Sequence, residues 1–453
     1  MPNLKSIFIP FINRSTVFSY FLTLVFLSAL YLVHIQKNLL FLVLVLLLCS
    51  CLFLIRNKKS EQLVLGMLSG IATIVIAYYL YQLVSTFTDI VEWDFLAFYV
   101  YGKAGADGLA FYDPTSFTNI LTTIHLPFSA GSDFNASIIQ VGVCYPPTTM
   151  LLLAPLGYLD LETANVVWRL FVLSFLIIDM VLIYRIYKLN QSKWIQALIV
   201  IVLTMILPGS STTMALSQTN FFLLFFLLLI YKDPDNWKAG IFLALAIVVK
   251  PIAAVWGIYF LINRKWKPIF SSVITGILLV LITVIWFGFD NFLTFFTSPP
   301  TSRIPGDVFI ETINQSMNAV FSRISIQLGF NSLFSYINWI VLSVSIILLL
   351  LTCIASRRLN TANPKAAFLI FLPLSLLIYP GCLMHYAVLL LPLFFSMILI
   401  KDRTNLVFLT VFLMVLSLSS FAVSFIILLV FITYAFLGIP IFTKFKELKA
   451  FQG

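Results

Sequence analysis

Long apolar stretches follow one another along almost the whole chain, and they constrain the possible folds more than any other feature. A transmembrane helix needs about 20 consecutive apolar residues. Eleven stretches reach or approach that length, at 17–35, 39–55, 62–84, 163–184, 193–208, 268–288, 336–356, 366–379, 386–400, 404–421 and 422–437. Four shorter ones lie at 146–158, 218–231, 239–249 and 251–262. The sequence therefore predicts an all-α polytopic membrane protein with about 11–14 transmembrane or re-entrant helices.

The composition excludes several other classes of protein. Of the 453 residues, 61% are hydrophobic and only 10% are charged, whereas a soluble domain carries about 25% charged residues. A soluble enzyme, a disordered protein and a nucleic-acid-binding domain are excluded, and no nucleic acid is expected as a partner despite the net charge of +10. Lys5 and Arg14 precede the first apolar stretch and no small-residue cleavage site follows it, so we expect a retained helix there and not a signal peptide.

The charged residues are distributed unequally between two sets of connecting segments. One set holds 21 Lys and Arg against five acidic residues. Its basic residues are Lys5/Arg14, Arg56/Lys58/Lys59, Arg185/Lys188/Lys193, Lys232/Lys238, Arg264/Lys265/Lys267, Arg357/Arg358/Lys365, Lys401/Arg403 and Lys444/Lys446/Lys449. Two long polar segments hold nine acidic and three basic residues. The positive-inside rule places the basic set in the cytoplasm, which predicts a multi-pass protein of the cell (plasma) membrane with both termini cytoplasmic.

This distribution divides the chain into five consecutive parts. They are N-terminal transmembrane helices (1–84), a first extracytoplasmic loop (85–145), transmembrane helices (146–288), a second extracytoplasmic loop (289–335), and C-terminal transmembrane helices with a cytoplasmic tail (336–453). No internal repeat of either hand is visible.

Two regions need a path other than a single crossing. The stretches 239–249 and 251–262 lie between basic ends on the same side, and each is only about 18 Å long at about 1.5 Å per residue. They predict a hairpin of short helices that turns at Lys250–Pro251. For 146–184 two alternatives remain: either 146–158 enters the membrane and returns, or Arg185 to Lys193 lies outside against the charge rule.

Acidic and aromatic residues are densest just after the third apolar stretch. Asp89, Glu92 and Asp94 are followed by aromatic side chains, and Asp94, Phe98 and Tyr101 have the i, i+4, i+7 spacing of one helix face. The spacing predicts an amphipathic helix on the outer leaflet; the alternative is a solvated acidic loop end with an aromatic belt. A carboxylate at headgroup level is well placed to act as a general base toward a lipid-borne substrate.

Two charged residues fall inside apolar stretches. Lys250 is the only Lys in its apolar run, and an intramembrane cation is costly and usually marks a functional pathway; the alternative is that its ammonium group snorkels to the outer headgroups. For Asp179 we expect a structural partner in the interior of the bundle. Gln218 and Asn220 are interpreted as amides that cap the start of a helix.

Polar residues on the outer side near the second loop are of the kinds that bind phosphate or sugar. Arg303 and Arg323 flank Asn314 and Gln315; Arg is the natural bidentate partner of a phosphate, although isolated loop arginines are usually only solvated. His385, at the outer end of a helix, either lies beside the helix cap without a role or hydrogen-bonds a phosphate or sugar hydroxyl.

The cysteines give no metal or redox motif. Cys144 and Cys382 fall on the outer side, where a disulfide between them is the less favoured alternative to two free thiols. The chain contains no Cys-x-x-Cys and no metal-ligand spacing, so neither a metal nor another cofactor is expected.

An ordered set of short motifs resembles one known family. The motifs are Asp-Phe-x-x-Phe-Tyr (94–99), Gly-x-x-x-Tyr-Asp-Pro (108–114), Tyr-Pro-Pro (145–147), Ser-Gln-x-Asn (217–220), Gly-x-x-Leu-Ala-Leu-Ala-x-x-x-Lys-Pro (240–251), Asn-Arg-Lys-Trp-Lys (263–267), Asn-Gln-Ser (314–316) and His-Tyr-x-x-Leu-Leu-Leu-Pro (385–392). No motif is specific alone. Their order over about 85–400 resembles the polyprenyl-phosphate-mannose-dependent alpha-mannosyltransferases of glycosyltransferase family 87.

The resemblance implies a GT-C glycosyltransferase fold and an integral-membrane transferase of the cell envelope that needs no metal. Its donor would be a polyprenyl-phosphate sugar, by default mannose, and its acceptor a glycolipid or glycan on the extracytoplasmic face. In this family pattern Asp94 is the general base of an inverting displacement. The expected ligands of the donor phosphate are Lys250, His385, Arg303 and Arg323. The expected substrate-binding residues are Tyr99, Lys103, Tyr112, Tyr145, Gln218, Asn220, Asn314, Gln315 and Tyr386.

The sequence also departs from the family pattern. Trp93 precedes Asp94, and two apolar stretches come before the third where family members often have one. A membrane transporter or a flippase for lipids or glycolipids is the alternative function, favoured by Lys250 and Asp179 within the membrane. A polymerase or ligase of the same fold would differ only in its acceptor.

Overall fold

The computed structural model describes residues 39–54, 61–88, 93–110, 112–123, 145–189, 191–297, 314, 316–329, 336–361, 364–399, 409–410 and 413. These residues form helices only, apart from an isolated bridge between Asn314 and Leu383. Up to residue 232 the elements are α3 (Leu39–Leu54), α4 (Glu61–Thr88), α5 (Trp93–Ala106), α6 (Pro114–Thr123), η2 (Pro147–Thr149), α8 (Met150–Leu153), η3 (Ala154–Tyr158), α9 (Leu161–Ile186), α10 (Lys193–Ile206), α11 (Pro208–Ala215) and α12 (Asn220–Lys232), where η marks a 3-10 helix.

The second half of the chain continues in the same way. Its elements are α13 (Trp237–Val249), η4 (Pro251–Ala254), α14 (Val255–Ile262), α15 (Trp266–Phe287), α16 (Phe289–Thr297), α17 (Met317–Gln327), α18 (Ile337–Asn360), α19 (Pro364–Leu369), α20 (Phe371–Ile378), η8 (Met384–Leu390) and α21 (Leu391–Leu399).

Four of the described helices are long and apolar enough to cross a membrane, namely Glu61–Tyr81 within α4 and the whole of α9, α15 and α18. The pair α10 and α11 would make a fifth span, broken by a bend of 64°. The prediction of an all-α polytopic membrane protein is therefore confirmed. The predicted spans 17–35 and 422–437 lie outside the described residues, and only three residues of 404–421 are described.

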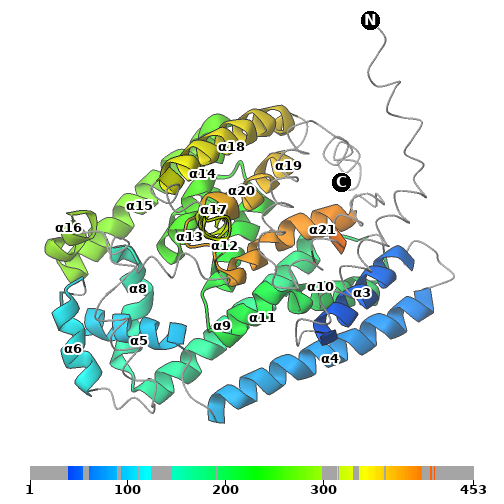
Figure 1. Cartoon of the computed structure of the whole chain (residues 1–453), viewed down its shortest axis with the longest axis horizontal. Coiled ribbons are helices and arrows are strands. Elements are labelled where there is room, and N and C mark those ends of the chain that lie inside the picture. The colour runs from blue at the N-terminus through cyan, green and yellow to red at the C-terminus, as the bar shows by residue number, and fades with distance from the viewer. Residues whose placement is uncertain are drawn as a thin grey trace, which may run out of the picture.

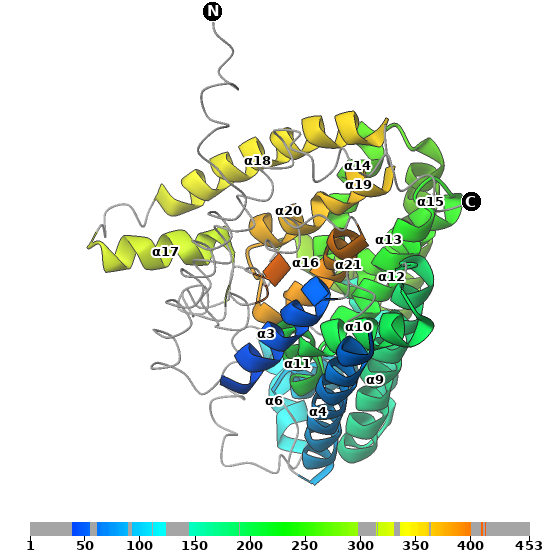
Figure 2. The same ribbon diagram turned by 90° about the vertical axis from the view of Figure 1, so that its right-hand side faces the viewer.

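The long helices are arranged around short apolar ones. α18 lies along one side of the molecule and α4 with α9 along the opposite side (Figure 1), and Figure 2 shows the same separation from the side. Between them α12 packs against α9, α13 and η8. α12 buries most of its circumference, including Phe221, Leu224 and Leu227, which is typical of a helix largely enclosed by its neighbours.

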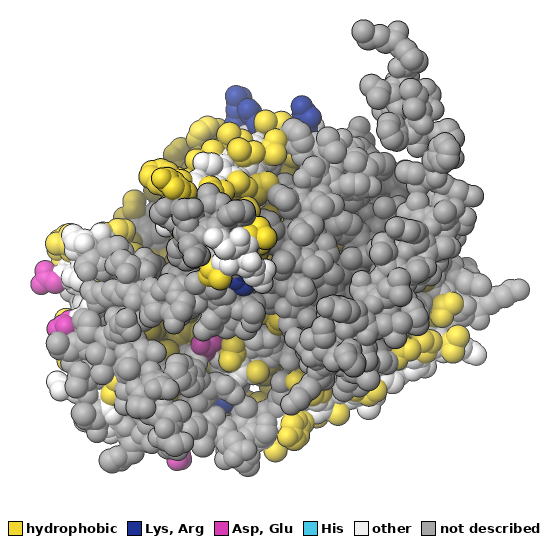
Figure 3. Space-filling model, in the orientation of Figure 1, with side chains coloured by type: hydrophobic (Ala, Val, Ile, Leu, Met, Phe, Trp, Pro, Cys, Tyr) yellow, Lys and Arg dark blue, Asp and Glu magenta, His cyan; other side chains and the backbone are white. Residues whose placement is uncertain are grey.

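Apolar side chains cover the outside of the long helices. On α15, Ile285 is 84% exposed and Trp286 66%, and on α18 Trp339 is 68% exposed. Hydrophobic side chains follow α18 and α4 along the surface in Figure 3. Water would penalise an apolar surface of this extent, whereas lipid does not, so these faces fit contact with the bilayer.

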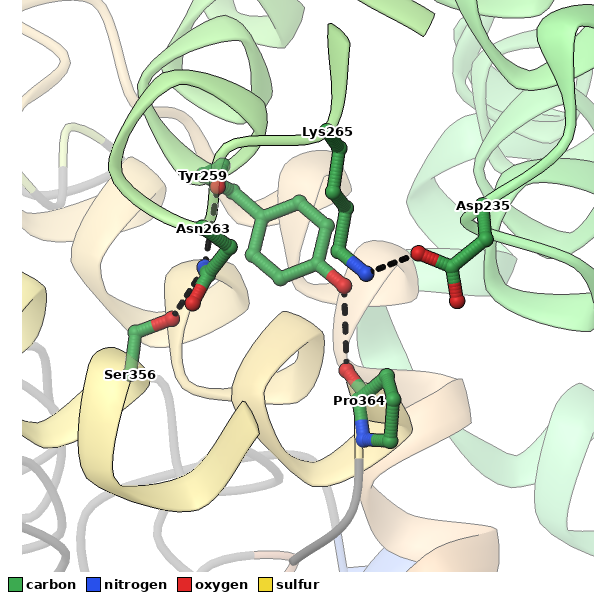
Figure 4. Close-up of polar contacts among 6 residues, drawn as sticks. All are labelled: Asp235, Tyr259, Asn263, Lys265, Ser356 and Pro364. Carbon is green, nitrogen blue, oxygen red and sulfur yellow. Dashed lines mark hydrogen bonds and ion pairs between the residues drawn. The ribbon is translucent and has the colours of Figure 1, made fainter. Parts of the chain in front are cut away.

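The chain turns back at Lys250–Pro251, as predicted. α13 leads to this point, and η4 with α14 leads away from it. The Lys265 ammonium group forms an ion pair with Asp235 (Figure 4), which joins the segment just before α13 to the turn between α14 and α15. The segment from Asp235 to Lys265 is therefore a closed hairpin of short helices.

Several helix ends meet where this hairpin begins and ends. The Tyr259 hydroxyl donates a hydrogen bond to the Pro364 carbonyl at 3.1 Å, and the Asn263 amide donates to the Ser356 hydroxyl at 2.9 Å (Figure 4). These bonds connect α14 to the end of α18 and the start of α19. The connecting segments at this end, 232–238, 263–267 and 357–365, all belong to the set that is rich in Lys and Arg. We call this end of the bundle the basic end.

The segment 145–159 enters the bundle and returns. At its start the Tyr112 hydroxyl donates to the Tyr145 carbonyl at 2.7 Å, and at its end the Tyr99 hydroxyl donates to the Leu159 carbonyl at 2.9 Å. Both ends are thus held by the α5–α6 region, and α9 then runs its full length to Arg185. Within the bundle, this path corresponds to the first of the two alternatives for this region, whose place in the membrane stays a prediction.

Two glycines allow this segment to lie directly on α5. A Cβ atom at Gly102 would collide with the carbonyl of Leu153, and one at Gly157 would collide with the backbone of Gly102. At the start of the segment the Thr149 hydroxyl donates to the Val248 carbonyl at 2.7 Å. The segment therefore connects α5 to the C-terminal end of α13.

Candidate functional site

Asp94 lies in the first turn of α5 and is partly exposed. An acidic residue is favourable there because the N-terminal end of a helix carries positive partial charge. Behind it the helix buries Phe98 and Tyr101, whose rings both contact the ring of Tyr145. The predicted helix is confirmed, and the alternative of a solvated loop end is wrong because α5 is packed on one face against the 145–159 segment.

Gln218 connects Asp94 to Lys250. Its Nε2 donates to Oδ2 of Asp94 at 2.6 Å, and its Oε1 accepts a hydrogen bond from Nζ of Lys250 at 2.8 Å. The same Nζ donates to Oδ1 of Asn220 at 2.9 Å and lies 4.2 Å from the centroid of the Tyr386 ring. Lys250 is only 1% exposed, so the ammonium group does not snorkel and belongs to a buried polar cluster.

The turn before α12 presents Gln218 to this cluster. Ser217 has φ = 54°, in the left-handed region that residues with a Cβ atom rarely adopt. The indole Nε1 of Trp168 donates to the Ser217 carbonyl at 2.8 Å and holds the turn against α9. Among the described residues, the buried hydroxyls of Ser217 and Thr219 have no hydrogen-bond partner, so the turn adds two polar groups beside Gln218.

The interpretation of Gln218 and Asn220 as helix caps is wrong. Thr219 is the residue at the cap position of α12, and no side chain makes a capping hydrogen bond there. Both amides instead accept hydrogen bonds from Lys250, because a buried ammonium group that has lost its contact with water needs acceptors.

His385 lies at the start of η8, next to Tyr386. It is 2% exposed, and its ring centroid is 4.8 Å from that of Tyr386. Its carbonyl accepts a hydrogen bond from the Thr213 hydroxyl at 3.3 Å, and Asn220 donates to the same hydroxyl at 3.3 Å. The imidazole is therefore adjacent to the aromatic ring that covers the Lys250 ammonium group.

Asn314 of the second loop reaches the chain just before His385, and Arg323 contacts Asn314. The Asn314 amide donates to the Pro380 carbonyl at 3.3 Å, and Asn314 pairs with Leu383 in the isolated bridge. Nη1 of Arg323 donates to the Asn314 carbonyl at 3.1 Å. Residues from five distant parts of the chain are thus gathered at the same end of the bundle, opposite the basic end.

The other predicted substrate-binding residues in the described part of the chain have structural contacts. The hydroxyls of Tyr99 and Tyr112 donate to the carbonyls that hold the 145–159 segment, which begins at Tyr145. Lys103 pairs with Asp107 at 3.0 Å on the exposed side of α5. At a rise of about 1.5 Å per residue it lies about 13 Å along the helix from Asp94, so the structure does not bring Lys103 into the cluster.

Four further expectations concern residues that lie outside the cluster or outside the described part of the chain. Arg303, Gln315 and Cys144 lie outside the described residues, while Cys382 is a buried free thiol. Asp179 is fully buried in α9, and neither of its carboxyl oxygens has a hydrogen-bond partner within the described part of the chain. The expectation of a structural partner for Asp179 is therefore wrong for this part of the chain.

Burial and polar contacts act in opposite directions on Asp94. Burial raises the pKa of its carboxyl group above the ordinary value, while the hydrogen bond from Gln218 and the positive charge of Lys250 lower it. Burial has the largest effect, so the pKa remains raised. A raised pKa makes the carboxylate a stronger general base, because it holds an accepted proton more firmly.

Sequence reasoning missed Trp168 and Ser217. A single Trp within an apolar helix gives no signal of its own, and the backbone conformation of Ser217 becomes visible only in the fold. Both act on the site by fixing the position of Gln218.

The cluster combines a carboxylate, an ammonium group, two amides and an imidazole. It contains a group that accepts a proton and groups that balance negative charge. In the described ranges, no three or more His, Cys, Asp and Glu side chains gather as a protein metal site requires.

Comparison with known protein families matches residues 144–380 to glycosyltransferase family 87. The matched range contains Gln218, Lys250 and Asn314, while Asp94 precedes it and His385 follows it. Neither the curated proteins nor the solved structures include a match to this chain. Since the family match spans more than half of the sequence and the fold is that of a multi-pass membrane protein, the chain belongs to glycosyltransferase family 87 and is a membrane glycosyltransferase.

Proposed function

We propose that the protein transfers a hexose, with mannose as the first choice, from a polyprenyl-phosphate sugar to a lipid-linked or glycan acceptor. The observation that supports this most directly is the hydrogen-bonded series of Asp94, Gln218 and Lys250. This series places a carboxylate with a raised pKa beside a buried positive charge. Glycosyl transfer needs both, because the acceptor hydroxyl loses a proton and the departing phosphate gains negative charge. The ordered motifs of the family support a polyprenyl-phosphate as the donor.

In the proposed mechanism Asp94 removes the proton of the acceptor hydroxyl group. The acceptor oxygen forms a bond to the anomeric carbon on the face opposite the phosphate. The bond from the anomeric carbon to the phosphate oxygen breaks, and its electron pair leaves with the phosphate, so the configuration at the anomeric carbon inverts. A positioned general base typically contributes a factor of about 10² to 10⁴ in rate.

The negative charge of the departing phosphate needs compensation. His385 and Arg323 are proposed to hydrogen-bond it, together with Arg303, and Lys250 contributes positive charge from within the cluster. Preorganised charges of this kind stabilise a developing anion, which is a task that a divalent metal performs in other enzymes. We therefore propose that transfer needs no metal and no other cofactor.

The remaining proposed contacts are with the sugar and the acceptor. Gln218, Asn220 and Tyr386 lie in the cluster itself, and Asn314 lies beside His385. Gln315, Tyr99, Lys103, Tyr112 and Tyr145 are proposed as contacts from the motifs of the family alone.

We place the site on the extracytoplasmic face of the cell membrane, with both termini in the cytoplasm. Asp94 and Lys250 lie at the turn of the 235–265 hairpin, whereas Asp235 and Lys265 lie at its open, basic end. The basic end belongs in the cytoplasm by the positive-inside rule, and the site therefore faces the other side.

A transporter or lipid flippase is the second candidate function. Asp179 favours this function, because a buried ionisable group in a membrane helix often marks a transport path. The bend between α10 and α11 also favours it, because transporters commonly use broken helices. A polymerase or ligase of the same fold would differ only in the acceptor.

Transfer by the purified protein in liposomes tests the proposal. Polyprenyl-phosphate mannose, glucose and galactose are supplied separately, with a lipid and glycan extract as acceptor and with a metal chelator present, and products are identified by mass spectrometry. We expect an acceptor heavier by one hexose, with the mannose donor giving the highest rate. Product formation only from nucleotide sugars, or only without the chelator, would contradict the proposal. Movement of the donor across the bilayer with no new product would favour the transporter.

A further inference from the structure

We propose that Lys250 acts on Asp94 through Gln218, as a positioning residue that keeps the general base ionised and correctly oriented in the free enzyme. This rests on the proposed role of Asp94 and changes the expected role of Lys250. Its ammonium group would serve the base and not hydrogen-bond the donor phosphate.

The contacts of Lys250 leave little capacity for a phosphate. Two of its N–H groups are engaged by Gln218 at 2.8 Å and by Asn220 at 2.9 Å, and the Tyr386 ring covers the ammonium group at 4.2 Å. The side chain is 1% exposed. A phosphate oxygen that bonded directly to Nζ would have to displace one of these partners.

The orientation of the Gln218 amide is determined by its two neighbours. An ionised carboxylate only accepts hydrogen bonds and an ammonium group only donates them. Gln218 meets both demands by directing its N–H to Asp94 and its carbonyl oxygen to Lys250. The reverse orientation would place acceptor against acceptor and donor against donor. The two charges therefore fix the amide, and the amide fixes one oxygen of Asp94.

The left-handed turn at Ser217 is a second, independent sign that this arrangement is selected. A left-handed conformation is unfavourable at a residue with a Cβ atom, and such conformations cluster at functional sites. Here the turn places Gln218 between the two charged groups, and the hydrogen bond from Trp168 holds it.

Lys250 is the charged group that acts on Asp94 among the described residues. The titratable groups in or near the cluster are Cys382, His385, Tyr386, Tyr379 and Tyr145. α5 itself carries Lys103, which pairs with Asp107 just after the helix. α9 carries Glu162 and Arg169, with Asp160 at its cap. Since an opposite charge nearby lowers the pKa of a carboxyl group, loss of the Lys250 charge raises the pKa of Asp94.

The test measures the protonation of Asp94 directly. A hydrophobic carbodiimide reacts with protonated carboxyl groups, and mass spectrometry of the peptide that contains Asp94 gives the extent of reaction at each pH. In the full-length protein, Lys250→Met should move the midpoint of this labelling curve to higher pH by about 1 unit. The acid limb of the transfer rate should move in the same direction, because the rate requires the carboxylate form.

Two further variants separate this effect from a loss of structure. Gln218→Leu removes the bridge while both charges remain, and it should also move the midpoint of the labelling curve to higher pH. This variant replaces Lys250→Met in the test if gel filtration shows that Lys250→Met does not fold. Lys238→Met removes an equal charge from the exposed start of α13 and should leave the midpoint unchanged. An unchanged midpoint in a folded Lys250→Met or Gln218→Leu protein would overturn the inference. If the wild-type protein transfers no hexose, the proposed function fails, but the labelling curves still decide the inference.

Discussion

Ser217 shows how one backbone conformation determines the geometry of the whole cluster. Its positive φ is tolerated by glycine and is most costly for β-branched residues. We expect Ser217→Gly to keep transfer activity near the wild-type level. Ser217→Val should lower the free energy of unfolding by about 1–2 kcal/mol and reduce the transfer rate, because the turn would move Gln218. Thermal unfolding in detergent and the transfer rate measure both effects, and equal behaviour of the two variants would show that the conformation is not required.

The motifs of the sequence predict roles for Asp94, Gln218, Lys250, Asn220 and Tyr386, and these roles stay predictions. The structure brings these five side chains into contact with one another. What a motif cannot give is the direction of each hydrogen bond. An amide before a helix looks like a cap, and only the tertiary fold shows that a buried ammonium group competes for it.

Among the helices, the packing of α5 depends on Gly102. An added Cβ would collide with the Leu153 carbonyl, so Gly102→Ala should displace α5 and move Asp94 away from Gln218. We expect a destabilisation of about 1–3 kcal/mol and a lower transfer rate. Gly66→Ala in α4 is the matched control, because an added Cβ there has nothing within 4 Å. If both variants retain the stability and rate of the wild type, α5 is not held in this way.

The lengths of the apolar stretches predict that the described helices exist. They predict less well where a helix bends or is interrupted. The hairpin at Lys250–Pro251 followed from helix length and charge, two properties that are local in sequence. The predicted span 193–208 instead bends at Leu207 and continues as α11. Gly209 explains why the bend is stable: a Cβ there would press against the backbone of Val388, a contact that no local pattern reveals.

At the scale of the whole molecule, the account requires the two ends of the bundle to lie on opposite sides of the membrane. With the native cysteines replaced, Asp107→Cys just after α5 and Lys238→Cys at the basic end are both exposed reporters. A membrane-impermeant maleimide should label Asp107→Cys in intact cells and Lys238→Cys only after the cells are opened. The opposite labelling pattern would invert the topology and place the site in the cytoplasm.

The proposed role of Asp94 as the general base of a glycosyl transfer is tested by the transfer rate of Asp94→Asn. Asparagine keeps the size of the side chain but cannot accept the proton. We predict that the rate falls by about 10² to 10⁴, while Asp107→Asn, an exposed residue just after the same helix, keeps the wild-type rate. A folded Asp94→Asn protein that transfers hexose as fast as the wild type would contradict the account.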